Sequence, residues 1–342
     1  MRSARYLLQI VITLLIVGQA TAQIKVAVGT CRPKLPMYTT ISDAVADVPS
    51  GSTVLVCPGN YPEQVTITQP LTLQGLNVGG AANPTITVPT AGLVENSTAA
   101  GLAALILVQG TGPVTISDLA VDGTTSVLPS EGIEAGIAFF DSNGTVANVA
   151  VRNISGYGAY LEEADTSGAV EIRNSFFEKF NTGIAIFGTL LTANVHGNVI
   201  ANNNVGIYID NASGNVSCNF ITSAGSNTEG IYDVFSPVAI SGNTIEGGNL
   251  GVNSVGGTGA IASNYIHATS TGISSLGSGK PTIQNNRIIN PSTAGIDLSC
   301  QPATLSSNTI NDAVLAIANV PEGLALGPNS YFNVTQVVSV CP

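Results

Sequence analysis

Short apolar runs recur along the chain at a nearly constant interval and predict a repeat. An Asn followed two residues later by Ile recurs at steps of 21, 24, 21, 22 and 22 residues, at Asn198/Ile200, Asn219/Ile221, Asn243/Ile245, Asn264/Ile266, Asn286/Ile288 and Asn308/Ile310. A second column of Gly followed by an apolar residue lies 8 to 11 residues after each Asn, for example at Gly206-Ile207 and Gly230-Ile231. Each unit therefore holds three runs of strand length, too short and too rich in Gly and Asn for helices.

A unit of this size cannot bury its own apolar face, so the pattern predicts stacked coils whose strands pair in parallel with the next coil. The fold class is all-β, a solenoid of about ten coils, which at about 4.8 Å per coil gives a rod on the order of 50 Å. Asn tolerates the left-handed backbone of a tight turn, and its amide both donates and accepts hydrogen bonds. We expect the Asn column to stack inside one of the turns.

The Asn and Gly columns resemble those of right-handed parallel β-helix proteins, the pectate-lyase-like superfamily, over residues 104–318. The segment from Tyr38 to Val65 resembles the opening of pectinesterase-like members. Within it, Ile41, Ala44 and Val45 follow cap-type residues at helical spacing, which predicts an amphipathic helix over the open N-terminal end of the core. We expect one domain over 23–342, with a cap and first coil at 23–75, coils at 76–318 and a C-terminal cap at 319–342.

Residues 1–22 have the charged, apolar and small-residue order of a secretory signal peptide, with an expected cleavage after Ala22. This predicts a secreted, extracellular or periplasmic protein that is not embedded in a membrane. The five cysteines then lie in an oxidising compartment, and their positions at the two ends predict the disulfides Cys31–Cys57 and Cys300–Cys341. Cys218 falls in the repeats, where we expect its side chain to point inward as a small hydrophobe.

Charge and motif content narrow the function. The formal net charge is −11 with 10 Lys+Arg against 21 Asp+Glu, which excludes a nucleic-acid binder. Only two His and no Cys-x-x-Cys are present, so we predict no metal site and no cofactor. The superfamily's enzymes carry recognisable catalytic sets, and the sequence contains none of them: Arg-x-Pro-x-x-Arg and Gly-His-Gly are missing, and no Arg occurs between Arg32 and Arg152.

The strands that begin at Gly-Ile carry the candidate chemistry. If the residue after each Gly points inward, alternation sends the next one outward, and the one two further on outward again. These outward columns place aromatic rings beside carboxylates, which suits sugar stacking and hydroxyl recognition. The candidate binding residues are Tyr160, Phe187, Tyr208, Tyr232 and Asp297. The alternative is that Tyr and Phe are only good strand formers lying under loops.

We therefore predict a secreted, monomeric protein that binds polysaccharide or serves as an extracellular scaffold without cleaving it. The alternative is an inverting glycoside hydrolase that uses Glu162 and Asp210. These two carboxylates share an outward column with one coil between them, so their backbones should lie about 9.6 Å apart. That spacing is near the upper end of the roughly 6.5–9.5 Å that leaves room for a water. Phe187, in the intervening coil, would supply the apolar contact that such an acid needs.

Overall fold

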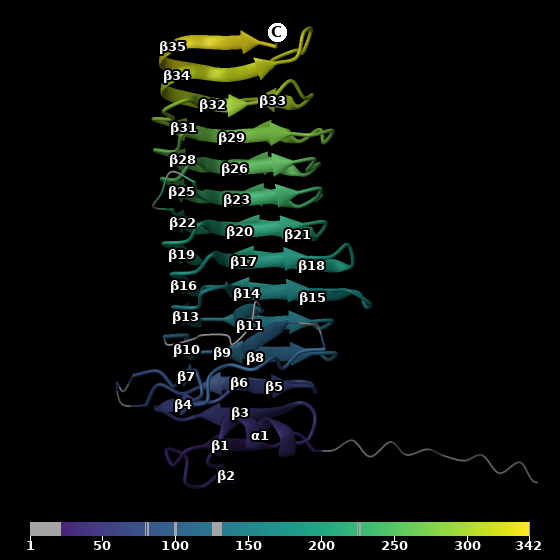
Figure 1. Cartoon of the computed structure of the whole chain (residues 1–342), viewed down its shortest axis with the longest axis vertical. Helices are drawn as coiled ribbons and strands as arrows, with labels where there is room; N and C mark the ends of the chain where they lie inside the picture. The colour runs from purple at the N-terminus through teal and green to yellow at the C-terminus, as the bar shows by residue number, and fades with distance from the viewer. Residues whose placement is uncertain are drawn as a thin grey trace, which may run out of the picture.

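The computed structural model describes residues 22–341 except 79, 81, 99–100, 125–131, 224 and 226. The predicted signal segment at 1–22 therefore lies almost wholly outside the described residues. The strands stack in three columns along one long axis, in order from the N-terminus to the C-terminus (Figure 1). The chain runs through the columns in the same sequence in each coil, which makes a right-handed parallel β-solenoid of about twelve turns.

The first column contains the strands that begin at or near the Gly-Ile pattern. They are β5 (Val65–Ile67), β8 (Leu102–Gln109), β11 (Ile133–Phe140), β14 (Tyr157–Glu162), β17 (Thr182–Phe187), β20 (Val205–Asp210), β23 (Glu229–Val234), β26 (Leu250–Val255), β29 (Thr271–Leu276) and β32 (Ala294–Asp297).

The second column is the thirteen-stranded sheet. It contains β2 (Met37–Tyr38), β1 (Lys25–Val28), β3 (Ser52–Val56), β6 (Leu71–Gly75), β9 (Val114–Ser117), β12 (Gly144–Ala147), β15 (Gly168–Arg173), β18 (Leu191–His196), β21 (Ser213–Ser217), β24 (Ala239–Ser241), β27 (Ala260–Ala262), β30 (Thr282–Gln284) and β33 (Thr304–Ser306).

The third column follows the Asn turn and consists of short strands. They are β4 (Asn60–Pro62), β7 (Thr85–Thr87), β10 (Ala120–Asp122), β13 (Ala150–Arg152), β16 (Phe176–Glu178), β19 (Val199–Ala201), β22 (Phe220–Thr222), β25 (Thr244–Glu246), β28 (Tyr265–His267) and β31 (Arg287–Ile289). The long strand β34 (Thr309–Val320) then continues both the third and the first columns, and β35 (Ser330–Val340) pairs with it in parallel.

The predicted N-terminal helix is present as α1 (Ile41–Asp47) and covers that end of the core. Its N-cap is Thr40, whose hydroxyl accepts a hydrogen bond from the backbone N–H of Asp43 at 3.1 Å. The Glu63 carboxylate accepts two more, from the backbone N–H of Ile41 at 2.8 Å and of Ser42 at 2.9 Å. These bonds satisfy the free N–H groups at the start of the helix.

The predicted Asn column forms a continuous hydrogen-bonded ladder. Asn243 is typical, because its Nδ2 donates to Val216 O at 2.9 Å and to Asn264 Oδ1 at 3.0 Å. Its Oδ1 accepts from the backbone N and from Nδ2 of Asn219, both at 3.0 Å. The ladder runs one step further than the sequence pattern indicated, through Asn198, Asn219, Asn243, Asn264, Asn286, Asn308 and Asn329.

The left-handed residue of this turn is the one before each ladder Asn, not the Asn itself. Cys218 has a φ of 55° and Gly242 a φ of 64° at this position. This left-handed residue interrupts the strand alternation. Its own side chain, directly before the ladder Asn, therefore points outward. The prediction that Cys218 points inward is therefore wrong, because its side chain is exposed and its sulfur is free.

The Gly column is required by the close approach of neighbouring coils. A Cβ on Gly206 would lie 2.5 Å from Gly230 O, and one on Gly230 would lie 2.6 Å from Gly251 O. These contacts are with backbone, which cannot move aside without separating the strands. The paired registers also skip each of these Gly positions, so Gly and the following apolar residue both face the core.

Both predicted disulfides are present and lie at the two ends of the solenoid. Cys31–Cys57 and Cys300–Cys341 each join Cα atoms 5.7 Å apart. The solenoid has about twelve turns rather than the ten predicted, because the first coils lack the Asn and Gly pattern and β35 adds a strand inside the segment assigned to a C-terminal cap. The division at 23–75, 76–318 and 319–342 remains a prediction.

Candidate functional site

The outer face of the first column carries the predicted site residues in two rows. Parallel pairing aligns Tyr160 with Ala185, then Tyr208, then Tyr232. The second row aligns Glu162 with Phe187 and then Asp210. The alternation inferred from the sequence thus brings six of the seven first-column candidates into four neighbouring strands, β14, β17, β20 and β23.

The aromatic side chains of both rows meet in one continuous series of ring contacts. Tyr160 and Phe187 have ring centroids 5.2 Å apart, and Phe187 and Tyr208 have centroids 5.4 Å apart. Tyr208 and Tyr232 follow at 5.3 Å with their planes at 81°. All three separations lie in the range of favourable tilted and edge-to-face pairs. We call Tyr157, Tyr160, Phe187, Tyr208 and Tyr232 the aromatic row.

Tyr160 is the least accessible member of the row. Only 7% of it is exposed, because it packs in a second apolar cluster on the outside of the sheet with Leu107, Ala138 and Ala185. Its hydroxyl donates to Glu162 Oε2 at 2.6 Å. Burial, followed by the neighbouring Glu162 carboxylate, raises the pKa of Tyr160. Tyr160 is therefore a buried packing partner of the Phe187 ring. Phe187, Tyr208 and Tyr232 are half-buried and expose ring surface to a ligand.

Glu162 and Asp210 lie in one outward row with Phe187 between them, as the inverting-hydrolase alternative requires. Two strand spacings of about 4.8 Å set their backbones about 9.6 Å apart. Both carboxylates are engaged locally, Glu162 by the Tyr160 hydroxyl and Asp210 Oδ1 by Asn211 Nδ2 at 2.7 Å. The Tyr208 ring is close enough to Asp210 for that charge to add to the effect of burial, and both raise the pKa of Tyr208.

Asp297 lies away from the aromatic row. It aligns with Ser274 on β29, and the strand β26 then separates Ser274 from Tyr232. Its Oδ1 accepts from the backbone N of Ser299 at 2.8 Å and from Asn319 Nδ2 at 2.9 Å. These contacts hold the turn after β32, so Asp297 is placed as a turn residue rather than beside the rings.

Two side chains on this face escaped the sequence reasoning. Tyr157 contacts Tyr160 with centroids 5.3 Å apart, and Glu229 accepts a hydrogen bond from Asn253 Nδ2 at 3.2 Å. Each stands directly before the Gly of its strand. Gly and the residue that follows it both face the core. The residue before Gly and the second residue after Gly therefore both point outward. Alternation counted only forward from the Gly could not find them.

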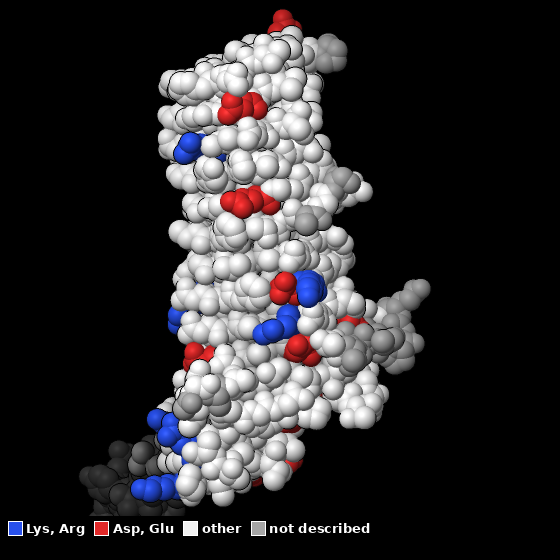
Figure 2. Space-filling view, turned by 90° about the vertical axis from the view of Figure 1, so that its left-hand side faces the viewer, with Lys and Arg blue, Asp and Glu red and all other residues white. Residues whose placement is uncertain are grey.

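The charges of this face are acidic. No first-column strand contains Lys or Arg, while Glu162, Asp210 and Glu229 all lie on its outer side. Burial raises the pKa of Glu229. On the adjoining side of the solenoid charged side chains of either sign are sparse, and several basic ones gather near the N-terminal end (Figure 2). A uronate chain laid on the aromatic row would meet carboxylates and no cation.

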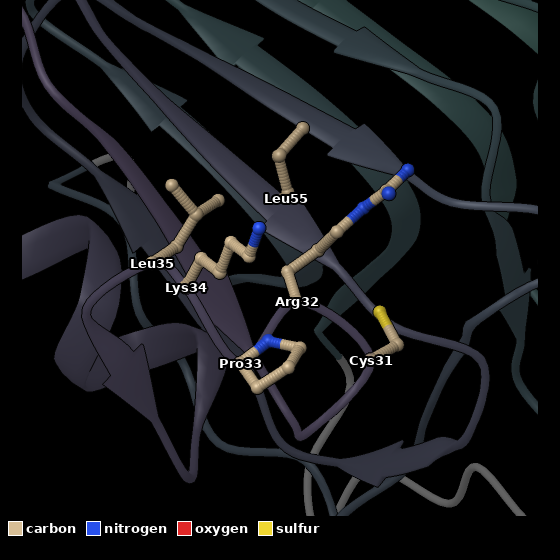
Figure 3. Close-up of a pocket in the computed structure, with 6 residues that line it drawn as sticks. All are labelled: Cys31, Arg32, Pro33, Lys34, Leu35 and Leu55. Atoms are coloured by element: carbon tan, nitrogen blue, oxygen red, sulfur yellow. The ribbon is translucent and has the colours of Figure 1, made fainter.

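A separate hollow lies at the N-terminal end, on the second column. It has a volume of about 420 Å³ and is lined by Cys31, Arg32, Pro33, Lys34, Leu35 and Leu55 (Figure 3). It is open, and its two basic side chains extend over β3. The strands β6, β9 and β12 lie between β3 and β15, the second-column strand that follows β14, so this hollow is distant from the aromatic row.

Within the described part of the chain, no helix is long and apolar enough to cross a membrane. In the same residues, no group of three or more His, Cys, Asp or Glu side chains is arranged to hold a metal ion. The side chains on the first-column face are aromatic rings, carboxylates, amides and hydroxyls. Such a set can stack on a sugar ring and accept hydrogen bonds from its hydroxyls.

Comparison with known proteins agrees with the fold. Residues 192–336 match the family described as the right handed beta helix region. The fold makes the chain a right-handed parallel β-helix protein, which confirms the resemblance drawn from the Asn and Gly columns. No protein of curated function matches the sequence.

Several solved structures share the fold at low sequence identity. A GH136 lacto-N-biosidase from Eubacterium ramulus superposes with a TM-score of 0.65 at 12% identity, over 92% of this chain and 68% of that one. An exopolygalacturonase from Thermotoga maritima gives 0.54 at 12% identity, over 84% of each chain. The mannuronan C-5 epimerase A-module from Azotobacter vinelandii gives 0.52 at 19% identity, over 87% and 93%. At these identities the likeness concerns the fold.

Proposed function

We propose that this protein binds a neutral polysaccharide along the aromatic row and does not cleave it. The observation that carries the proposal is the unbroken series of ring contacts from Tyr160 to Tyr232 across four neighbouring strands. Sugar rings stack on aromatic faces while their hydroxyl groups bond to carboxylates and amides nearby. The solved structures with this fold include proteins named for action on glycans, which supports a carbohydrate ligand.

We propose a neutral rather than an acidic glycan because the outer face of the first column carries carboxylates and its strands contain no Lys or Arg. Recognition of a uronate carboxylate calls for Arg or Lys, and the first-column strands have neither. Two disulfides and the character of residues 1–22 support export to an oxidising compartment, where polysaccharides are met. We expect the protein to act as a monomer.

Binding to a glycan array tests the proposal directly. The wild-type protein should retain neutral glucans or mannans in preference to polygalacturonate. Tyr208→Ala and Tyr232→Ala should each weaken binding by about tenfold, the loss expected when a stacked ring is removed. Tyr265→Ala is the matched control, because Tyr265 lies on the third column against Arg287. Equal binding by all four proteins, or no binding to any glycan, would contradict the proposal.

An inverting glycoside hydrolase is the second candidate, and the shared row of Glu162, Phe187 and Asp210 favours it. One carboxylic acid would protonate the leaving oxygen and the other carboxylate would activate a water. Release of reducing ends from the bound polysaccharide distinguishes the two functions. Activity that Glu162→Gln and Asp210→Asn each abolish would establish the hydrolase, whereas binding without release supports the non-catalytic proposal.

A further inference from the structure

Glu229 and Asn253 form a polar corner at the end of the aromatic row. Asn253 aligns with Tyr232 on the neighbouring strand, and Glu229 is the preceding outward residue on the strand of Tyr232. Asn253 is only 7% exposed, and on the neighbouring strands Leu250 aligns with Glu229 and Ser274 aligns with Asn253. The corner therefore stands beside Tyr232 on the outer side of the sheet.

Two hydrogen-bond acceptors in this corner are buried and have no donor among the described residues. Asn253 Nδ2 bonds to Glu229 Oε1 at 3.2 Å, which leaves Glu229 Oε2 and Asn253 Oδ1 without partners. A buried polar atom without a partner costs about 1–3 kcal/mol, and most such atoms in native proteins have a protein or water partner. Both atoms belong to outward-pointing residues but are covered by their neighbours, so a ligand hydroxyl reaches them from the outer side only when those neighbours move aside.

We propose that Glu229 and Asn253 form a hydroxyl-recognition subsite, which takes two neighbouring hydroxyl groups of a neutral sugar ring lying against Tyr232. This inference rests on the proposed function, because it names how one end of the aromatic row recognises its ligand. One hydroxyl donates to Glu229 Oε2 and the other to Asn253 Oδ1. The same two contacts discriminate against an acidic sugar, whose carboxylate would face the Glu229 carboxylate.

The alternative ligand for two oxygen acceptors is a cation, and the corner fits one poorly. Calcium takes six to eight oxygens and usually several carboxylates. Here one carboxylate and one amide oxygen converge, while an aromatic ring forms the adjoining wall.

The test measures affinity and stability together. Wild type, Glu229→Gln and Asn253→Leu are titrated calorimetrically at pH 7 in EDTA with hexasaccharides of β-1,3-glucan, β-1,4-glucan, β-1,4-mannan and α-1,3-glucan. Each variant should bind at least tenfold more weakly, the size of one hydrogen bond involving a charged or desolvated group. The thermal midpoint of Glu229→Gln should stay unchanged or rise, because the substitution removes a buried carboxylate oxygen that has no donor. A residue with only a structural role would lower it. Asn253→Leu also removes the Nδ2 donor to Glu229 Oε1, so only its affinity is compared.

Matched controls are Glu178→Gln on β16 and Asn215→Leu on β21, which change the same residue types on the other two columns. If wild type binds and Tyr232→Ala weakens binding while both corner variants bind as wild type, the subsite is wrong and the proposed function stands. If wild type binds no glycan, both fail. Binding that EDTA abolishes and calcium restores would assign the corner to a cation and overturn the subsite.

Discussion

The two tight turns of each coil bury polar side chains with opposite results. In the turn between the second and third columns, every ladder amide from Asn198 to Asn308 both donates and accepts. In the turn between the third and first columns, Asn203 Nδ2, Ser223 Oγ and Thr269 Oγ1 are buried without a partner among the described residues. In the first turn every ladder amide is fully bonded, whereas the second turn leaves buried polar groups unpaired, although Asn203 Oδ1 still accepts from Phe180 N at 3.0 Å.

The backbone explains the difference. In the second of these turns, backbone N–H groups reach the carbonyls of the preceding coil, as Val205 N does to Asn181 O at 3.0 Å and Leu250 N to Thr228 O at 3.2 Å. In the Asn turn, the carbonyl of the next-to-last residue of each second-column strand is reached by an Asn Nδ2 instead, as Ile261 O is by Asn286. Where a side chain replaces a backbone hydrogen bond, the same residue type is needed in every coil. Where the backbone groups already bond to one another, the side chain is free to vary between coils.

Removal of one ladder amide should have the largest effect. Asn243→Ala deprives the backbone N–H and Nδ2 of Asn219 of their shared acceptor and removes the Nδ2 donor to Val216 O, while Asn264 Oδ1 keeps only the backbone N–H of residue 243. Several buried groups lose partners at once, so we expect a loss of about 3–5 kcal/mol in the free energy of unfolding by urea. Asn215→Ala, an exposed Asn bonded only to Asn194, should cost far less. Equal losses would show that the ladder contributes no more than a surface amide.

A carboxylate in the core gives the next largest effect. Asp233 occupies an inward position aligned with Ile209 and Ser254, is 2% exposed, and accepts a hydrogen bond from Ser254 Oγ to Oδ2 at 2.9 Å. Burial raises its pKa from 3.8 to about 6. In the unfolded chain it ionises at the lower pKa, so ionisation favours unfolding. The penalty is absent below pH 3.8, grows as the pH rises, and is complete above about pH 6.

Asp233→Asn removes this penalty. Relative to wild type, the variant should gain about 3 kcal/mol in unfolding free energy between pH 4 and pH 7, since each unit of pKa shift is worth about 1.4 kcal/mol. Urea unfolding at pH 4, 5, 6 and 7 measures the gain, and Asp165→Asn, on an exposed loop, controls for the change in net charge. A constant difference between Asp233→Asn and wild type across this range would mean that Asp233 does not titrate in the folded protein as inferred.

Repetition decides how much the sequence could predict. The Asn and Gly columns were readable because the same contact is needed in every coil, and the helix over Ile41–Asp47 because apolar spacing marks its buried side. The outward row from Tyr160 to Tyr232 followed from alternation. Alternation fails where the backbone departs from an extended strand, at the left-handed corner of Cys218 and at the paired inward residues after Tyr157 and Glu229.

Burial on the outer face was harder still to predict. Tyr160 is covered because Leu107 and Ala138 come from coils 22 or more residues earlier and form an apolar cluster beside it. The inward direction of Asp233 also contradicts the general rule that charged residues avoid the core. Both depend on packing between coils rather than on any pattern within one repeat.

A hydroxyl in the Asn turn should stabilise the fold. Ser175 stands where the next coil has ladder residue Asn198, and its Oγ accepts from Val149 N at 3.1 Å and donates to Arg173 O at 2.9 Å. Ser175→Ala leaves Val149 N buried without an acceptor, so we expect a loss of about 1–3 kcal/mol in urea unfolding. Ser175→Asn, which restores an amide at this position, is the informative companion. No loss in Ser175→Ala would place Ser175 outside the ladder.

The matching change in the other turn should have the opposite sign and the smallest size. Thr269 is 2% exposed, and its Oγ1 has no partner among the described residues. Thr269→Val keeps the shape of the side chain and replaces the unpaired hydroxyl by a methyl group, so unfolding should require up to about 1 kcal/mol more free energy. Thr192→Val is the control, because Thr192 Oγ1 lies 3.0 Å from Ser213 Oγ on the surface. A loss of stability in Thr269→Val would mean that this hydroxyl has a partner, such as an ordered water, and that the two turns differ less than their contacts indicate.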